Sequence, residues 1–205
     1  MYCIFVAGMP AAGKSTMAEM IAGRMKLPVL SKDAIKERLY DEVGFRSREE
    51  KVKLGTASME IMYYIAGQLM GAAQPFILEN NFEHSSEPGL RALLSKYQYP
   101  ALTILLTGDP KVVCQRFLER DMGTGRHRGH IVNDCYPERE GDGFSGKRTA
   151  ALSCEDYLRA VRTRGFDDFD IGGTKIRVDV TDFSTIDTEE LFSQIAVWKE
   201  QVLHG

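Results

Sequence analysis

The sequence is poor in cysteine, and the four cysteines that it contains show no paired spacing. Cys3, Cys114, Cys135 and Cys154 lie far apart in a chain of 205 residues. Disulfide frameworks and zinc sites usually place cysteines at short, regular intervals, so this pattern favours reduced thiols in a cytoplasmic protein. Two histidines lie close to Cys135, but no second thiol stands at ligand spacing, and we expect no bound zinc.

The chain also lacks a long apolar run and an excess of positive charge. No stretch approaches the roughly 20 apolar residues that a membrane span needs. The short apolar start has no basic leader and no small-residue cleavage site, so we predict a soluble, cytoplasmic protein without membrane contact. A formal net charge of −3 argues against a nucleic-acid-binding surface, although it is compatible with a basic cleft in an acidic body.

Short apolar segments alternate with segments of helical periodicity along the whole chain. The apolar segments, which we predict to be strands, are residues 1–7, 27–31, 75–79, 101–107 and 174–180. Strands that alternate with helices are joined by crossover connections, which makes the strands parallel. We therefore predict a single α/β domain over residues 1–205, a three-layer α/β/α sandwich with a five-stranded parallel sheet.

The part of the chain from about residue 122 to residue 172 differs in composition from the rest. Within 122–152, glycine, arginine, aspartate and histidine replace most apolar residues, which is typical of a mobile surface segment. We interpret this segment as the start of a lid or substrate region at about 122–172. Gly172 and Gly173 are interpreted as the turn of a small hairpin before the last strand. Ser47, Asp109 and Ser153 are expected to cap helices.

A glycine-rich motif follows the first predicted strand. Residues 8–15 read GMPAAGKS, which matches the phosphate-binding pattern G-x-x-x-x-G-K-S/T. Gly8 and Gly13 allow backbone N–H groups to point inward at phosphate oxygens, and the following helix adds the positive end of its dipole. Lys14 is expected to reach the β- and γ-phosphates, and the Ser15 hydroxyl to bind Mg²⁺. The alternative, an ordinary strand-to-helix turn, is disfavoured by the flanking segments.

The nucleotide-binding residues are expected to come from this loop and from a second loop near the end of the chain. The candidate nucleotide ligands are Gly8, Met9, Pro10, Ala11, Ala12, Gly13, Lys14, Ser15, Thr16 and Thr181. Thr181 belongs to the stretch VDVTDFST, which follows the last strand and is placed to flank the nucleotide base. As an alternative, Thr181 and Asp182 begin a turn and cap the final helix. The guanine-reading motif N-K-x-D is missing, which disfavours a GTPase.

Two carboxylates lie where strands of the predicted sheet end. Asp33 follows the second strand, and its carboxylate is placed to accept a hydrogen bond and then the proton of an acceptor hydroxyl. Its alternative role is a helix N-cap, which is compatible with the first. Lys36 and Arg38 are either ligands of an anionic acceptor or solvated helix charges. Glu79 ends the third strand and is expected to orient a Mg²⁺-bound water or the nucleophile.

Two asparagines follow Glu79 in the stretch FILENNF. Asn80 and Asn81 either bind the substrate or form a turn, and we favour the turn slightly.

Basic residues gather before and within the glycine-rich segment. They are Arg116, Arg120, Arg126, His127, Arg128 and His130. Arg116 and Arg120 stand one helical turn apart on one face. Phosphoryl transfer spreads negative charge over the γ-phosphoryl oxygens, and arginines on a closing lid neutralise that charge. The alternative is a polar helix face followed by a basic loop.

Taken together, the motifs resemble those of the AAA-type P-loop kinase group, which includes polynucleotide 5′-hydroxyl kinases, chloramphenicol phosphotransferase and zeta-toxin-like kinases. The stretches that carry the resemblance are GMPAAGKST, SKDAIKERL, FILENNF, CQRFLERD, GRHRGH and VDVTDF. The likeness covers most of residues 1–130 and 174–203 and is weak across 131–172.

The resemblance implies a P-loop NTPase fold with a mobile lid, and roles for individual residues. It implies ATP and Mg²⁺ as cofactors, Lys14 and Ser15 as nucleotide and magnesium ligands, and Asp33 as the acceptor-activating carboxylate. The lid candidates that it implies are Arg116, Arg120 and Arg126. Polynucleotide kinases of this kind tend to have an arginine three residues after the aspartate, where this chain has Lys36. Lysine binds phosphate bidentately less well, so a nucleic-acid acceptor is disfavoured.

These observations predict an ATP-dependent kinase that phosphorylates a hydroxyl of a small molecule. A polynucleotide 5′-hydroxyl kinase is the second hypothesis. The third is a nucleotide-gated binding module with slow ATPase activity, in which residues 131–172 contact a protein.

Overall fold

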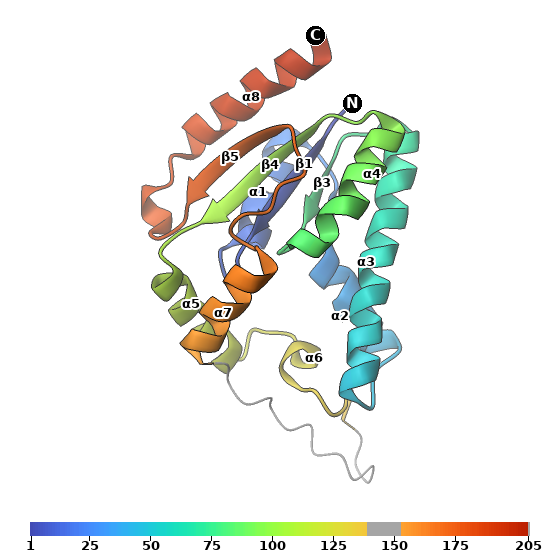
Figure 1. Cartoon of the computed structure of the whole chain (residues 1–205), viewed down its shortest axis with the longest axis vertical. Helices are drawn as coiled ribbons and strands as arrows, with labels where there is room; N and C mark the ends of the chain where they lie inside the picture. The colour runs from blue at the N-terminus through green and yellow to red at the C-terminus, as the bar shows by residue number, and fades with distance from the viewer. Residues whose placement is uncertain (139–152, 205) are drawn as a thin grey trace.

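The computed structural model describes residues 1–138 and 153–204, and it contains a five-stranded sheet whose strands are all parallel. The strands are β1 (Cys3–Gly8), β2 (Val29–Ser31), β3 (Phe76–Glu79), β4 (Ala101–Thr107) and β5 (Thr174–Asp179). Their order across the sheet is β2-β3-β1-β4-β5, so the first strand lies at the centre. The predicted α/β fold with its five-stranded parallel sheet is confirmed (Figure 1).

Helices cover both faces of the sheet and form the outer two layers (Figure 1). They are α1 (Lys14–Met25), α2 (Lys32–Glu42), α3 (Arg48–Gly71), α4 (Glu87–Tyr97), α5 (Pro110–Met122), α6 (Arg128–Ile131), α7 (Cys154–Arg164) and α8 (Thr188–His204), with short 3₁₀ turns η1 (His84–Ser86) and η2 (Phe183–Thr185). Buried side chains of α1, α5, α7 and α8 form one apolar cluster, and those of α3 and α4 form another.

The central strand explains how the sheet separates these two clusters. All six residues of β1 are buried, as expected for a strand covered on both faces. Successive side chains of a strand point to opposite faces, so Ile4 and Val6 join the cluster with α1, while Phe5 packs with α3. The phosphate-loop motif therefore begins at the end of the most deeply buried strand.

The predicted helix caps are present, and one predicted turn is not a hairpin. Ser47, Asp109 and Ser153 each accept a hydrogen bond from a backbone N–H in the first turn of their helix. Gly172 and Gly173 have positive φ values of 80° and 78°. They lead into β5, which pairs in parallel with β4, and no strand of the described residues precedes it to form a hairpin.

The expectation that all four cysteines are reduced thiols is wrong for one pair. Cys114 in α5 and Cys154 in α7 form a disulfide with a Cα–Cα distance of 5.8 Å, because the two helices pack side by side. Their 40-residue separation in sequence hides this proximity. Cys3 and Cys135 are free and buried.

Two features are absent from the described residues. These residues contain no cluster of three or more histidine, cysteine, aspartate and glutamate side chains that could hold a metal ion. None of their helices combines the length and the apolar character that crossing a membrane would require.

The described part of the glycine-rich segment is packed against α2 and is not only a surface segment. Val132 is fully buried and belongs to one apolar cluster with Tyr40 and Phe45. Gly129 lies against Tyr40 so closely that a Cβ atom would stand 2.4 Å from the ring. The interpretation of 122–152 as a mobile surface segment is therefore wrong for this packed stretch, and its remainder, 139–152, lies outside the described residues.

Candidate active site

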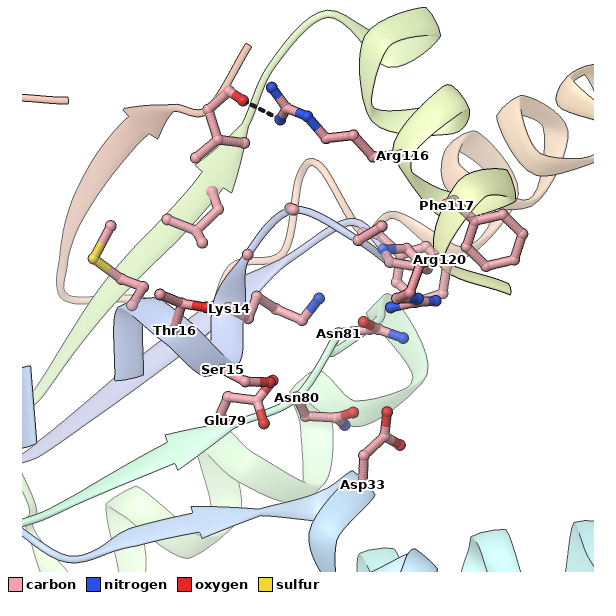
Figure 2. A pocket seen from close by; sticks show the side chains of 18 of the residues that line it. Lys14, Ser15, Thr16, Asp33, Glu79, Asn80, Asn81, Arg116, Phe117 and Arg120 are labelled. Atoms are coloured by element: carbon pink, nitrogen blue, oxygen red, sulfur yellow. Dashed lines mark hydrogen bonds between the residues drawn. The ribbon is translucent and has the colours of Figure 1, made fainter. Parts of the chain in front are cut away.

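Most of the predicted site residues line one cavity of 870 Å³ at the carboxyl edge of the sheet (Figure 2). Those that line it are Pro10, Ala11, Ala12, Gly13, Lys14, Ser15, Thr16, Asp33, Glu79, Arg116, Arg120 and Arg126. They come from the ends of β1, β2 and β3 and from α5 and the chain after it. Parallel sheets gather ligands at this edge, and segments that are distant in sequence meet here.

Three predicted nucleotide ligands do not line the cavity. Gly8 and Met9 are buried at the start of the loop, with Met9 only 1% exposed. The hydroxyl oxygen of Thr181 accepts a hydrogen bond from the backbone N–H of Asp109 at 2.7 Å. Asp182 caps η2 rather than the final helix. The nucleotide-binding role of these three residues stays a prediction.

The backbone of the phosphate loop has the left-handed conformations that its glycines permit. Gly8 has φ 140°, and a Cβ atom there would lie 2.4 Å from the carbonyl oxygen of Leu106 in β4. Gly13 has φ 81° and lies against the ring of Phe183. No side chain caps the start of α1, so the backbone N–H groups of its first turn are available to an anion.

Lys14 is buried within the loop that precedes it. Its ammonium group donates a hydrogen bond of 2.8 Å to the carbonyl oxygen of Met9, and the residue is 7% exposed. Burial lowers the pKa of Lys14 to about 8, although the carboxylates of Glu79 and Asp33 oppose this shift. The positive charge of Lys14 therefore lies at the cavity, and the carboxylates of the protein do not fully offset the cost of burying it.

Glu79 and Ser15 bring two oxygen donors together at the base of the cavity (Figure 2). The hydroxyl of Ser31 donates a hydrogen bond of 2.6 Å to Glu79 Oε2. Burial raises the pKa of Glu79, and the charge of Lys14 opposes that rise. A buried carboxylate beside a serine hydroxyl suits a hard cation such as Mg²⁺, which takes few protein ligands and keeps water and phosphate oxygens as the rest.

Asp33 lies on the second residue of α2 and does not cap that helix. Ser31 caps it, since its hydroxyl accepts a hydrogen bond of 3.3 Å from the backbone N–H of Ala34. The alternative role of Asp33 as N-cap is therefore wrong, and its carboxylate points to the cavity (Figure 2). Burial acts to raise the pKa of Asp33, but its interaction with His130 and then with Lys32 and Lys36 outweighs burial and holds the pKa below its usual value.

One carboxylate holds two of the predicted lid arginines. Asp121 Oδ1 accepts hydrogen bonds from Arg120 Nε at 3.2 Å and Nη2 at 3.1 Å, and lies 3.2 Å from Arg126 Nε. Arg126 Nε is buried, and its contact with Asp121 is an ion pair without a hydrogen bond. Both guanidinium groups line the cavity and act on the charge of Lys14.

Arg116 lines the cavity but is bound to a different loop. Its guanidinium group donates hydrogen bonds to the carbonyl oxygens of Val180 at 2.5 Å and Thr181 at 2.6 Å. It also lies over the ring of Phe183, 4.2 Å from the centroid. Although Arg116 and Arg120 lie on the same helix, the structure directs Arg116 to the loop after β5 (Figure 2). Its catalytic role stays a prediction.

Helix α6 is bound to α2 and α3 by side chains that are far apart in sequence. His127 Nε2 lies 3.0 Å from Asp41 Oδ1, and His130 Nε2 lies 2.9 Å from Glu37 Oε1. Burial lowers the pKa of His130 to about 3, and the negative charge of Asp33 opposes that shift.

Lys51 on α3 holds the end of α6. Its ammonium group donates hydrogen bonds to the carbonyl oxygens of His130, at 2.8 Å, and Val132, and to Asn133 Oδ1 at 3.0 Å. The residue is 5% exposed, and burial lowers its pKa to about 7.

Sequence reasoning did not identify three residues that shape this site. Asp121 directly follows Arg120, so a search for a partner of the lid arginines could have found it. Lys51 looks like an ordinary charge of a long helix. Tyr157 lies where the motifs are weak, yet its hydroxyl donates a hydrogen bond of 2.8 Å to the carbonyl oxygen of Pro10 and ties α7 to the phosphate loop.

Comparison with solved structures shows the same fold in kinases. The chain is similar to a protein from Chloroflexus aurantiacus J-10-fl whose kinase activity is inferred. The two have 25% identity and a TM-score of 0.75, with 98% of this chain and 96% of that chain covered. A gluconokinase from Sinorhizobium meliloti 1021 gives 16% identity and a TM-score of 0.55, with 100% of this chain and 97% of that chain covered. A sugar kinase from Janibacter sp. HTCC2649 gives 13% identity and a TM-score of 0.55, with 98% of this chain and 95% of that chain covered. The last two likenesses show the fold alone.

Sequence comparison identifies a family but no individual relative. No curated protein sequence matches the chain. The model of the AAA_33 family, described as an AAA domain, matches residues 3–128, which contain the phosphate loop, Asp33, Glu79 and the lid arginines. A phosphate loop of this kind implies nucleotide binding. The chain therefore belongs to the AAA_33 family and has a kinase-like P-loop fold.

Proposed function

We propose that the protein is an ATP-dependent kinase that transfers the γ-phosphoryl group to a hydroxyl of a small molecule. One observation carries the proposal: the phosphate loop, the Asp33 carboxylate and two guanidinium groups line the same cavity. Phosphoryl transfer needs these three components together, because the protein must bind the triphosphate, orient a nucleophile and neutralise charge. Its likeness to the Chloroflexus protein supports the same class of reaction.

ATP would bind with its triphosphate in the loop and its base near the chain after β5. The backbone N–H groups from Gly13 to Thr16 and the ammonium group of Lys14 would bind phosphate oxygens. Thr181, Arg116 and the ring of Phe183 flank the base. Ser15 and Glu79 would hold Mg²⁺, directly or through water, and the ion would supply positive charge that stabilises the phosphates.

Asp33 would act on the acceptor hydroxyl. Its lowered pKa keeps the carboxylate ionised at neutral pH, so it accepts a hydrogen bond from the hydroxyl. The hydroxyl oxygen forms a bond to the γ-phosphorus while the bond from that phosphorus to the bridging oxygen of ADP breaks. The proton passes to Asp33, and ADP leaves with the electron pair. A loose transition state needs little basicity from the carboxylate.

The lid would consist of residues 122–172 as predicted, of which the structure describes 122–138 and 153–172. Arg126 of the lid and Arg120, which lies just before it in α5, would offset negative charge that develops on the γ-phosphoryl oxygens.

The experiment has two readouts, MgATP binding by calorimetry and ADP release over a panel of hydroxyl compounds that includes a 5′-hydroxyl oligonucleotide. Asp33→Asn should bind MgATP within about twofold of wild type and lose at least about 100-fold in transfer rate. Lys14→Met should lose both MgATP binding and phosphate transfer. Asp168→Asn, which removes an exposed carboxylate that does not line the cavity, is the matched control. The proposal fails if MgATP does not bind, or if Asp33→Asn transfers phosphate at the wild-type rate.

A further inference from the structure

The turn after β3 is held by its backbone and by one aromatic side chain. The N–H of Asn80 donates to the carbonyl oxygen of Val6, and the N–H of Gly8 donates to the carbonyl oxygen of Asn81, both at 3.3 Å. Phe82 has φ 46° and is 1% exposed, and its ring stacks on that of Phe169 with centroids 5.0 Å apart. These contacts fix the turn next to the phosphate loop without any help from the asparagine side chains.

Asparagine is common in turns because its side chain hydrogen-bonds to nearby backbone. Neither asparagine does so here. Asn80 Nδ2 donates one weak hydrogen bond, of 3.7 Å, to the sulfur of Met59, and the side-chain amide of Asn81 makes no hydrogen bond to any described residue. Both side chains line the cavity, and Figure 2 shows them between Lys14 and Asp33. The turn therefore does not explain why these two residues carry amides.

We propose that Asn80 and Asn81 bind the acceptor, and that the acceptor is an uncharged compound with at least two neighbouring hydroxyl groups. This inference rests on the proposed function. Each amide offers N–H donors and a carbonyl acceptor, and a hydroxyl group is both donor and acceptor, so the two groups match. With Asp33 on the reacting hydroxyl, the amides would bind the hydroxyls beside it and orient the nucleophile toward the γ-phosphorus.

The charges around this part of the cavity favour an uncharged acceptor. Arg164 lines it, but its guanidinium group is paired with both carboxylate oxygens of Glu83, at 2.7 Å and 2.8 Å. Arg120 and Arg126 share Asp121.

Lys36, which would be the ligand of an anionic acceptor, does not line the cavity. Its ammonium group lies 5.4 Å from the centroid of the Tyr40 ring, and its stem lies beside Gly55 of α3. Among the polar side chains that line this part of the cavity, the two amides are the groups left without a strong hydrogen bond in the described structure.

The test measures ADP release with glycerol, ribitol, myo-inositol and glucose, each beside a deoxy analogue that lacks one hydroxyl. Sugar acids, n-butanol and the 5′-hydroxyl oligonucleotide complete the panel. We expect at least one polyol to be phosphorylated, with kcat/KM at least about 100-fold above that of its deoxy analogue, because unpaired amides penalise the missing hydroxyl. Asn81→Ala and Asn80→Ala should each raise the KM of the polyol about tenfold and leave the KM of MgATP within about twofold.

Two further variants test whether the effect is specific to the amides in the cavity and to their hydrogen bonds. Gln201→Ala removes an exposed amide from α8, and its kinetics should match those of wild type. Asn81→Ser keeps a hydroxyl that both donates and accepts, so it should recover part of the polyol affinity, and thermal melting checks that every variant is folded.

Three results would overturn the inference while the proposed function stands. In the first, the KM of MgATP rises as much as that of the polyol. In the second, the ratio between polyol and deoxy analogue is unchanged in Asn81→Ala. In the third, only sugar acids or n-butanol are phosphorylated. If only the oligonucleotide is phosphorylated, the proposed small-molecule kinase and the inference both fail. If MgATP does not bind, or if no compound of any class is phosphorylated, the proposed function fails and the inference fails with it.

Discussion

The phosphate loop and the lid face the same cavity, but different kinds of interaction hold them in place. The loop is a contiguous stretch whose shape comes from glycine backbone conformations and from hydrogen bonds to the neighbouring strand ends. Helix α6 of the lid has only four residues and is held by side chains of α2 and α3, such as Asp41 and Lys51. A local backbone motif is difficult to loosen without unfolding the sheet, whereas a segment held by a few side chains can be released by changing one of them.

The largest expected effect comes from filling the close approach behind the loop. Gly8→Ala places a Cβ atom 2.4 Å from the backbone of β4 at a φ of 140°, and we expect a loss of about 3 kcal/mol in unfolding free energy. Urea denaturation of the variant and of the wild type measures this difference in unfolding free energy. Gly23→Ala in α1 is the control, because its Cβ would meet nothing within 4 Å, and it should stabilise the protein by up to about 1 kcal/mol. A Gly8→Ala protein as stable as wild type would remove the argument that the loop backbone is rigid.

Removing Lys51 tests whether side-chain contacts hold helix α6 of the lid in place. Lys51→Met leaves buried acceptors of His130, Val132 and Asn133 without their donor, and we expect a loss of about 2 kcal/mol together with faster hydrogen exchange in α6. Lys53→Met removes an exposed lysine, paired only with Glu49, and should change stability by less than about 0.5 kcal/mol. Equal effects of the two variants would mean that α6 does not depend on this anchor.

The pH dependence of MgATP binding should report the buried lysine of the loop. The pKa of Lys14 is about 8 in the free protein, and bound phosphates raise it, so the favourable charge is present below pH 8 and is lost as the pH rises through that value. Calorimetry should show affinity falling about tenfold between pH 7 and pH 9. A folded Lys14→Arg variant, whose guanidinium group stays charged, should show no such fall. A flat profile for wild type would contradict the assignment.

The smallest expected effect concerns the carboxylate between the two lid arginines. Asp121→Asn keeps the size of the side chain but removes the negative charge that holds Arg120 and Arg126 together, and we expect kcat to fall about fivefold. The KM of MgATP should change less than kcat if the arginines act in the transition state. An increase of kcat would instead show that Asp121 holds the arginines away from the phosphates.

The same contrast explains what could be predicted from the sequence. The loop, the strands and the caps Ser47, Asp109 and Ser153 depend on residues that are close in sequence, and their positions were predictable from local patterns. The convergence of Asp33 and Glu79 at one edge followed from the parallel sheet, because the carboxyl ends of parallel strands share that edge.

What escaped prediction depends on pairs of residues that are distant in sequence. Cys114 and Cys154 meet only because α5 packs on α7, and no local pattern records that contact. Tyr157 reaches Pro10 for the same reason. The direction of Arg116 depends on where the loop after β5 ends. Side-chain direction at Asn81 is settled only by the packing of Phe82, which occupies the buried side of the turn.

The central position of β1 also constrains how the chain can fold. Cys3 pairs with Phe76 on one side and with Ala101 on the other, so the strand has no neighbour near it in sequence. Such long-range pairing makes folding slow and cooperative. A ribosome-bound chain that ends before residue 101 would hold every residue of the nucleotide loop and still lack the neighbour that shapes it, so binding competence arises late in synthesis.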